Sequence, residues 1–410
     1  MDRNSKRFVV ARFLSIMSLF PVEIFITFQL SSSPLYFGLF GATILAGLIV
    51  RFLFQPILSD VIDRYSRVRI QITAQIISTT FLMSIFLLFN VVGNSTPGIY
   101  VLIAIMNDLY YMVSYQVQQA LAQSVFSQNM YGRLNGVNEI MGQLPVVLGS
   151  AMTSLVLIFL NFRELILVSA LFQVVGIIAF WVVKDGFEPT ANPKKGRVYS
   201  NYSESYGYLR KNRKPVLFIY LLNFPFIAVV AGNYLKPIFI VSVLAQSSSF
   251  LAISESVYAG VAILAGAIVP LVMERVGGMK TVYMCTTIFF VGSLLIPVAP
   301  LWYLFLIFQI LHGFGNPGTR IARNTIVMKS VPKNEMGRFN GSVQLLTTMT
   351  RIILISVSML EVLSVGAGTL IFAIGTIVFV AEMLAGILLS RNPDVKSYFG
   401  ISSLGKVEPA

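Results

Sequence analysis

The chain has 410 residues, of which 56% are apolar and only 11% are charged. A soluble domain carries about 25% charged residues. The composition therefore excludes an ordinary soluble protein and indicates that lipid is the solvent for much of the surface. The formal net charge of +13 does not indicate nucleic-acid binding, because the basic residues lie between apolar segments. The single cysteine, Cys285, excludes an intrachain disulfide.

A helix that crosses a bilayer needs about 20 mostly apolar residues. Twelve segments satisfy this requirement in chain order: 8–30, 34–57, 70–92, 98–121, 135–160, 164–183, 215–241, 250–273, 280–300, 301–326, 340–363 and 366–389. We interpret the first as a retained helix and not as a signal peptide, because a second apolar segment follows it at once. The sequence predicts an all-α polytopic membrane protein with antiparallel neighbouring helices.

The positions of the Lys and Arg residues predict the orientation in the membrane. Of these 30 residues, 23 lie at the termini or in alternate loops when Lys280, at the edge of its segment, is counted with the loop before it, and Arg163 alone lies in the opposite loops. Because basic loops stay in the cytoplasm, we expect both termini to be cytoplasmic in a multi-pass protein of the cell (plasma or inner) membrane. We expect an N-terminal six-helix half at 1–184, a cytoplasmic linker at 185–214, a C-terminal six-helix half at 215–391 and a cytoplasmic tail at 392–410.

A short repeat relates the two halves. Gly132-Arg133-Leu134-Asn135-Gly136 begins the predicted helix 135–160, and Gly337-Arg338-Phe339-Asn340-Gly341 begins the helix 340–363, 205 residues later. Six predicted helices separate the two copies, so both face the same side of the membrane. The repeat is therefore parallel and favours two halves related by an axis along the membrane normal.

The loop after the predicted helix 34–57 reads Ser59-Asp60-Val61-Ile62-Asp63-Arg64-Tyr65-Ser66-Arg67-Val68-Arg69. It resembles the signature loop of the major facilitator superfamily, Gly-x-x-x-Asp-Arg-x-Gly-Arg-Arg, with serine at both glycine positions. A degenerate second copy, Glu274-Arg275-Val276-Gly277 and then Lys280, follows the helix 250–273. The resemblance implies twelve helices in two halves around a central cavity, and a conformational role for Asp63, Arg64 and Arg67.

Other segments resemble one branch of this superfamily. The stretches Ser33–Leu39, Gln55-Pro56 and Val331–Arg338 are similar to the enterobactin exporters and macrolide efflux proteins. Two departures weigh against proton-driven drug antiport. Only Gly149 remains of the antiporter motif Gly-Pro-x-x-Gly-Gly, and the predicted helix 98–121 lacks the buried arginine of many drug exporters.

Ionisable side chains near the bilayer centre are candidate functional residues, because each costs about 2.5–3.5 kcal/mol on insertion. Four are central in the predicted helices: Glu23, Asp108, His312 and Arg351. Glu23 and Asp108 are the expected proton carriers, and neither has a basic partner on its own helix. His312 is the competing carrier, because histidine titrates near neutral pH.

Two predicted helices carry polar stripes at equivalent depths. Residues spaced by three or four positions share a helix face. In helix 301–326 the stripe is Gln309, His312, Asn316, Arg320 and Arg323, and Asn107, Tyr111, Tyr115 and Gln118 lie 205 residues before the last four. The resemblance implies that these helices line a cavity, and the alternative is structural hydrogen bonding between helices. The candidate cavity residues are Glu23, Asn107, Asp108, Tyr111, His312, Asn316 and Arg351.

The expected function is secondary active transport of a small organic solute by alternating access, as an exporter coupled to protons. The chain contains no Walker-type phosphate loop, which argues against an ATP-driven pump. The alternatives are facilitated or coupled uptake of an organic anion, and the flipping of a lipid or lysolipid. We expect no enzyme activity, cofactor, metal or nucleic-acid partner, and we expect the transporter to act as a monomer in the lipid bilayer.

Overall fold

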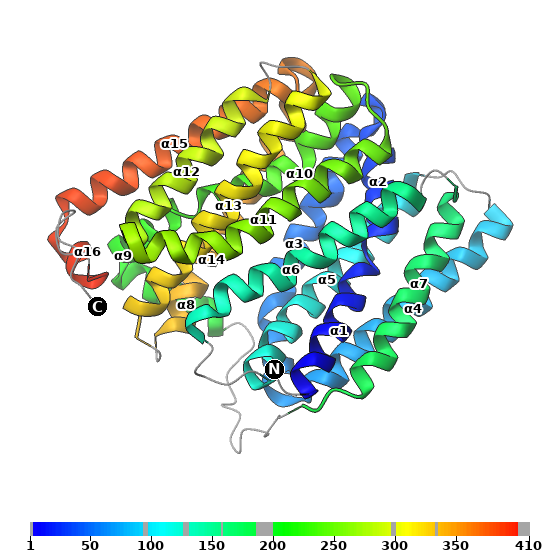
Figure 1. The fold of residues 1–410 in the computed structure, drawn as a ribbon, viewed down its shortest axis with the longest axis horizontal. Helices are drawn as coiled ribbons and strands as arrows, with labels where there is room; N and C mark the ends of the chain where they lie inside the picture. Colours follow the sequence, from blue (N-terminus) through cyan, green and yellow to red (C-terminus); the bar gives the residue numbers. More distant parts are fainter. Residues whose placement is uncertain are drawn as a thin grey trace. The chain divides into compact units, whose positions relative to one another are not determined.

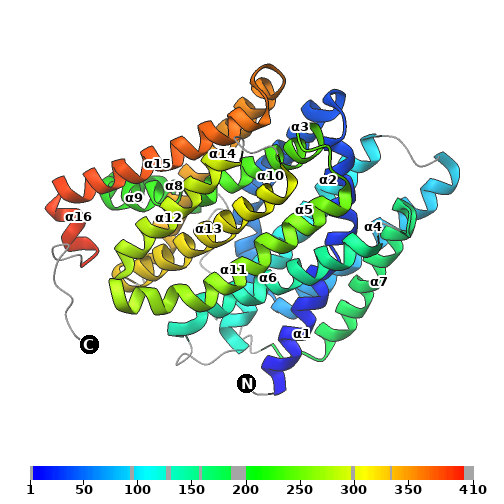
Figure 2. The same cartoon turned by 45° about the horizontal axis from the view of Figure 1, so that its top comes forward.

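The computed structural model describes residues 3–92, 97–125, 131–156, 159–185, 200–296, 301–332 and 335–400. These residues form helices and turns, with no strand among them. Ten of the described helical segments are long and apolar enough to cross a membrane. α6 and α13, which carry more polar residues, complete the twelve predicted spans, so the all-helical prediction is confirmed (Figures 1 and 2).

Local sequence signals begin and end these helices. Ser33 is the N-cap of α3, where its side chain accepts a hydrogen bond from Leu35 N. α7 begins with a reciprocal capping box between Asn161 and Glu164. Gly366, with φ of +81°, separates α14 from α15 in a backbone conformation that only glycine adopts readily.

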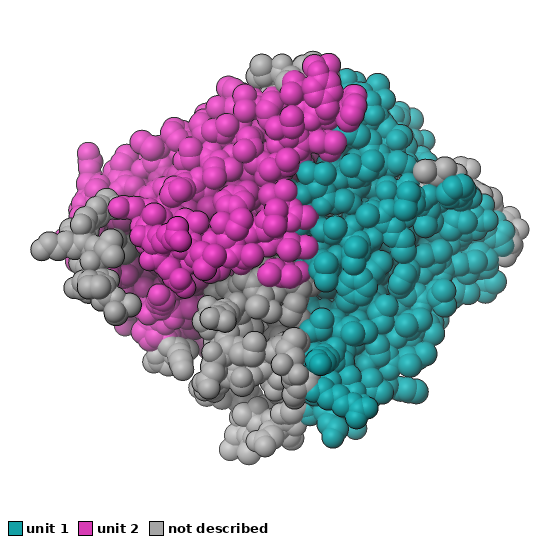
Figure 3. All heavy atoms as spheres, in the orientation of Figure 1, with its two compact units in different colours: residues 1–132, 141–198, 240–259 teal, residues 133–140, 199–239, 260–410 magenta. Residues whose placement is uncertain are grey.

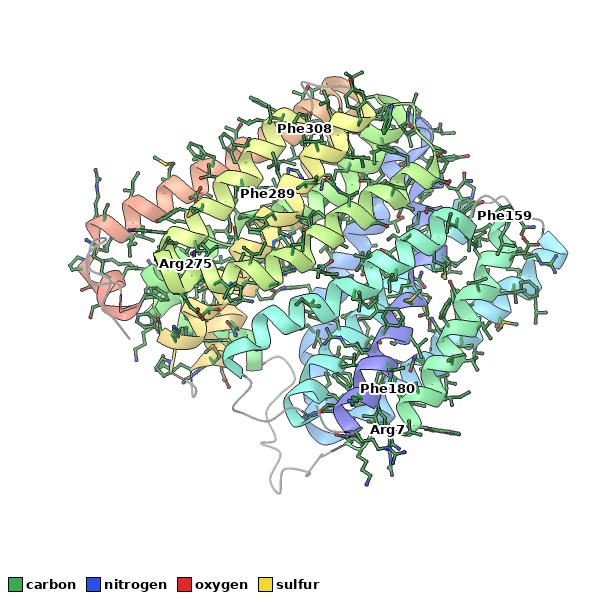
Figure 4. The ribbon with its side chains drawn as sticks, in the orientation of Figure 1. Arg7, Phe159, Phe180, Arg275, Phe289 and Phe308 are labelled. Atoms are coloured by element: carbon green, nitrogen blue, oxygen red, sulfur yellow. The ribbon has the colours of Figure 1, made fainter. Side chains whose placement is uncertain are left out.

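The chain divides into two compact units (Figure 3). Unit 1 contains residues 1–132, 141–198 and 240–259. Within it, α4 packs against α5 and α7, α1 against α5 and α7, and α3 against α2 and α5. Phe8, Leu121 and Phe180 form part of its buried core, and Phe180 is labelled in Figure 4. The helices of this unit are α1 (Arg3–Met17), α2 (Phe20–Ser31), α3 (Pro34–Arg64), α4 (Arg67–Val92), α5 (Pro97–Val125), most of α6 (Tyr131–Val156) and α7 (Phe162–Trp181).

Unit 2 contains residues 133–140, 199–239 and 260–410. Within it, α12 packs against α13 and α15, and α14 packs against α8, α9 and α15. Its core includes Phe218, Val282, Ile321 and Phe339. Its helices are α8 (Ser200–Lys211), α9 (Arg213–Leu221), most of α10 (Phe224–Ser242), the second part of α11 (Ser248–Val276), α12 (Gly278–Leu295), α13 (Trp302–Ser330), α14 (Met336–Val365), α15 (Ala367–Arg391) and α16 (Pro393–Tyr398). The predicted domain boundaries at 184 and 214 stay a prediction.

Two predicted spans are interrupted at related places. The span expected at 8–30 consists of α1 and α2, and the span expected at 215–241 consists of α9 and α10. The second residue of α2 is Pro21, and the second residue of α10 is Pro225. Proline lacks an N–H and its ring crowds the preceding turn, so each proline removes a helical hydrogen bond at the interruption. Apolar periodicity alone does not reveal this.

The linker and the tail both contribute helices to unit 2. Tyr208, on α8, donates a hydrogen bond to the carboxylate of Glu335 at 2.8 Å, and its hydroxyl lies 3.2 Å from that of Tyr398. Ser342, on α14, donates to the carbonyl oxygen of Ser205 at 2.7 Å. These contacts attach α8 and the end of α16 to the start of α14.

Candidate transport sites

A neutral hydrogen-bonded network joins α1, α4 and α5 in unit 1. Gln71 Nε2 donates to Ser114 Oγ at 2.6 Å and to Ser15 Oγ at 3.2 Å. Ser15 Oγ and Tyr110 OH lie 2.6 Å apart, and Gln118 Nε2 donates to Ser15 Oγ at 3.1 Å. All five side chains are buried. Such a network holds helices together in lipid by satisfying polar groups that water cannot reach.

Asp108 forms a salt bridge across two helices of unit 1. Its carboxylate accepts hydrogen bonds from both Nε and Nη2 of Arg51, on α3, and the Nε contact is 2.8 Å long. The ring of Tyr111 lies 5.6 Å from the Arg51 guanidinium carbon. The glycine at position 47 leaves room for the carboxylate, because a Cβ there would lie 2.6 Å from Asp108 Oδ2. The basic partner that Asp108 lacks on its own helix therefore comes from α3.

Glu23 interacts electrostatically with Arg51 of this salt bridge. It is exposed on α2, whereas its neighbours Val22 and Ile24 are buried. Its charge is attracted by Arg51 and repelled by Glu255, on α11. Arg51 is therefore a counter-charge that two carboxylates of unit 1 share.

The other predicted residues of unit 1 differ in exposure. Tyr111 is 38% exposed and its ring centroid lies 5.8 Å from that of Tyr115, which is also exposed. Asn107 is only 7% exposed. The exposed face of α5 therefore presents two aromatic rings beside the Arg51–Asp108 pair, while Asn107 faces the interior.

His312 is buried in unit 2 against α12. Its Nε2 lies 3.0 Å from Ser293 Oγ, and its ring stacks on Phe289 at 4.5 Å between centroids. Phe289 is labelled in Figure 4. Nδ1 of His312 has no hydrogen-bond partner among the described residues. A cavity of about 20 Å³, lined by Lys236, Ser293 and His312 among others, lies beside it and has room for one water molecule.

Glycines bring α13 close to α12 and so fix the position of His312. A Cβ at Gly315 would lie 2.6 Å from Phe289 N, and one at Gly318 would lie 2.5 Å from Cys285 Sγ. A Cβ at Gly292 would lie 2.7 Å from His312 Cδ2. Small residues allow this close approach of helices in membranes.

Arginines gather around the interruption between α9 and α10 in unit 2. Arg323 is 7% exposed and donates hydrogen bonds to the side-chain oxygens of Asn223 and Asn324. Asn223 also donates to Thr347 Oγ1 at 2.7 Å. Arg323, on α13, is therefore tied to α14 through the side chain of Asn223.

Two further arginines lie over one aromatic ring. The guanidinium carbon of Arg351 is 4.1 Å from the centroid of Phe226, and that of Arg320 is 5.5 Å from it. Arg351 Nη2 also donates to the carbonyl oxygen of Phe226 at 3.0 Å. Asn316, predicted for the same stripe, is 2% exposed. The predicted residues Arg351, His312 and Asn316 thus lie in one unit, and Arg351 joins a cluster with Arg320 and Arg323.

The signature loop connects the ends of helices in unit 1. Arg67 Nη1 donates to the carbonyl oxygen of Ala120 at 3.1 Å. Ser66 Oγ accepts from Arg69 N at 3.4 Å and donates to Asp185 Oδ2 at 2.8 Å, so a serine at the glycine position acts as a helix cap. Asp63 and Arg64 belong to the last turn of α3, and their side chains lie outside the described residues.

Sequence reasoning missed several residues of these sites. Gln71 belongs to a series with Gln75 and Thr79 at spacings of four on α4, and this polar face was a usable signal. Phe226 gave no signal, because a phenylalanine in an apolar helix is expected everywhere. Among the described residues, no group of three or more His, Cys, Asp or Glu residues could hold a metal ion.

Many long apolar helices that carry ionisable groups are typical of polytopic transport proteins. The sequence matches the profile of the Major Facilitator Superfamily over residues 8–353, and the chain belongs to this family. No curated protein matches the sequence.

Three solved structures illustrate the shared fold, with 14–15% identity to this chain. The nucleoside transporter NupG is similar with a TM-score of 0.68, and the match covers 95% of this chain and 100% of that one. An outward-facing bacterial homologue of the iron transporter ferroportin gives 0.67, with coverage of 95% and 100%. The human organic anion transporter MFSD10 (TETRAN) gives 0.62, with coverage of 94% and 100%.

Proposed function

We propose that this member of the superfamily exports a small organic solute by alternating access and couples export to protons. The observation that carries the proposal is the charged group of unit 1, in which Asp108 and Glu23 share Arg51. Ionisable groups held at membrane depth mark substrate or proton pathways in transporters. The cell membrane is the proposed location, with both termini and the 185–214 linker in the cytoplasm, and the monomer is the proposed working unit.

The shared arginine supplies a mechanism for coupling. When a proton neutralises Asp108, the charge-assisted hydrogen bonds from Arg51 weaken and the guanidinium is free to favour Glu23. When the proton leaves, Arg51 returns to Asp108. This exchange is a two-state element whose equilibrium a proton biases, which is what coupling requires.

Further residues have proposed roles in the cycle. The other candidate cavity residues, in addition to Glu23 and Asp108, are Asn107 and Tyr111 of unit 1 and His312, Asn316 and Arg351 of unit 2. Asp63, Arg64 and Arg67 govern the conformational change, and the contact of Arg67 with the end of α5 supports a role at a moving helix end. The proposed relationship is to the enterobactin exporter and macrolide efflux branch, on the segments described above.

Proteoliposomes with an imposed pH gradient test the coupling. The purified protein is assayed with a panel of radiolabelled organic acids, amines and neutral solutes, in both membrane orientations. Glu23→Gln and Asp108→Asn should fold, and at least one should abolish gradient-driven accumulation while solute exchange continues. Exchange needs no net proton movement. His312→Gln tests the competing carrier, and Glu204→Gln, on the exposed surface of α8, is the matched control.

Each outcome has a defined meaning. Full accumulation in both carboxylate variants shows that the carboxylate proposal is wrong. Full accumulation in the histidine variant as well excludes proton coupling through all three groups. Accumulation driven only toward the cytoplasmic side contradicts export and supports uptake.

A further inference from the structure

Three positive charges lie close together in unit 2. Arg320 and Arg351 approach the same ring of Phe226, and both repel the charge of Arg323. Arg323 and Arg351 are 7% and 8% exposed, so little water screens this repulsion. The assembly of like charges at low dielectric is unfavourable by itself.

The contacts of Arg323 do not cancel its charge. Both of its hydrogen-bond acceptors are amide oxygens, from Asn223 and Asn324. Amides satisfy the geometry of the guanidinium, and no described carboxylate hydrogen-bonds to Arg323 to compensate its positive charge. A bound anion would offset this charge and convert the repulsion into attraction.

The equivalent positions of unit 1 provide an internal comparison. Tyr115 and Gln118 lie 205 residues before Arg320 and Arg323. Gln118 belongs to a network of neutral groups that hydrogen-bond to one another, with Ser15 as its partner at 3.1 Å. Helix packing at this place therefore does not require charge, and the buried charge of Arg323 needs another explanation.

We propose that Arg320, Arg323 and Arg351 bind the carboxylate or phosphate group of an organic anion, with the ring of Phe226 packing against its apolar part. The planar guanidinium donates paired hydrogen bonds that match these groups. Arg320 and Phe226 are partly exposed and form the accessible side of the site, and Arg323 forms its buried end. That this anion is the transported solute rests on the proposed transport function.

Binding to the purified full-length protein in nanodiscs of neutral phosphatidylcholine tests the site. The probes are benzoate and phenyl phosphate, with benzamide as the uncharged control, and the readouts are calorimetric affinity and melting temperature. Wild-type protein should bind both anions and not benzamide. Arg323→Gln should weaken anion binding about tenfold or more. Arg391→Gln, which removes a charge from the exposed end of α15, should stay within about twofold.

Asn223→Asp keeps the test decisive if Arg323→Gln folds poorly. It places a carboxylate against Arg323 and satisfies the charge from within the protein. We expect a melting temperature at least as high as that of the wild type, together with loss of anion binding. Anion binding of wild-type strength in Asn223→Asp would show that the proposal is wrong.

A parallel arm distinguishes a free solute from a lipid headgroup. Phosphatidylglycerol that co-purifies with the wild type, but not with Arg323→Gln, would support the anion site and assign it to a lipid. If neither the soluble anions nor this lipid distinguish wild type from Arg323→Gln, the proposal is overturned. No gradient is used, so failure here leaves proton coupling standing, and failure of proton coupling leaves the anion site standing.

Discussion

The third and fourth spans of each half are held together in different ways. In unit 1, α4 and α5 are joined by hydrogen bonds from Gln71 to Tyr110 and Ser114. In unit 2, α12 and α13 approach each other closely at glycines, with Gly315 against the backbone of Phe289, and hydrogen bonds join them only in pairs, Thr286 with Thr319 and Ser293 with His312 among the described residues. The position of Gly315 corresponds to Tyr110 after a shift of 205 residues, so one fold position carries a large hydroxyl residue in one half and no side chain in the other.

This difference determines which positions in each half can carry charged side chains. A neutral network needs no counter-charge, because its members donate to and accept from one another, although Gln71 Oε1 has no partner among the described residues. Close glycine packing involves only small groups, so it leaves the opposite face of α13 available for arginines. The repeated architecture therefore fixes the helices, and the two halves place their charges on different elements. Unit 1 has Arg51 and Asp108 on α3 and α5, whereas unit 2 has arginines on α13 and α14.

The largest expected effect comes from the glycine contact. Gly315→Ala would place a Cβ 2.6 Å from Phe289 N and 2.7 Å from Cys285 O, both of which are backbone atoms. We expect a loss of about 3 kcal/mol in the free energy of unfolding, at the upper end for overpacking. Thermal unfolding in detergent measures it. Gly260→Ala, with no atom within 4 Å, is the control, and equal melting temperatures for the two variants would contradict glycine packing.

An intermediate effect is expected in the network of unit 1. Gln71→Leu removes the donor that serves Ser15, Tyr110 and Ser114. Leaving buried hydroxyls with fewer partners should cost about 1–3 kcal/mol. Gln344→Leu is the matched control, because the described hydrogen bond of Gln344 stays within its own helix, to Thr348. If the two variants unfold at the same temperature, the network does not hold the helices.

The smallest expected change in the free energy of unfolding concerns the two copies of the signature loop. Ser66 caps α4 with its side chain and also donates a hydrogen bond to Asp185. Glycine is nearly as good at a cap position, so Ser66→Gly should cost only a few tenths of a kcal/mol when it is made in an Asp185→Ala background, where the second hydrogen bond is already absent. Gly277, with φ of +86°, precedes α12 in a conformation that side chains disfavour. Gly277→Ser should cost about 1 kcal/mol or more. Thermal unfolding of each variant against its own parent, Asp185→Ala for Ser66→Gly and the wild type for Gly277→Ser, tests this asymmetry, and equal losses would contradict it.

The sequence predicted the helices and their repeat because both are local properties. Spans of about 20 apolar residues and the repeated Gly-Arg-x-Asn-Gly segment need no knowledge of packing. The choice of Glu23, Asp108, His312 and Arg351 followed from the cost of ionisable groups in lipid. That cost identifies which residues need a partner.

The sequence did not predict the interaction partners of these residues, because the partners lie on other helices. Arg51 and Asp108 are 57 residues apart, and Arg351 reaches the carbonyl of Phe226 across 125 residues. The side of a span that faces a neighbouring helix depends on the rotation of the span about its own axis. An apolar segment contacts both lipid and protein, and both are apolar, so its sequence does not show this rotation. The interruptions are missed for a different reason: the spans are recognised from their apolar length, which a single proline such as Pro21 or Pro225 does not change.

The interruptions also bear on how the protein originated. Phe20-Pro21 and Phe224-Pro225 stand at the same place in the first span of each half, 204 residues apart. A feature present at equivalent places in both copies is most simply inherited from a single ancestral six-helix segment that was later duplicated. Arg320 and Arg323, whose positions correspond to Tyr115 and Gln118 in the other copy, then belong to the divergence that followed. The helix interruption at Pro21 and Pro225 would then have arisen before the arginines that lie near it in unit 2.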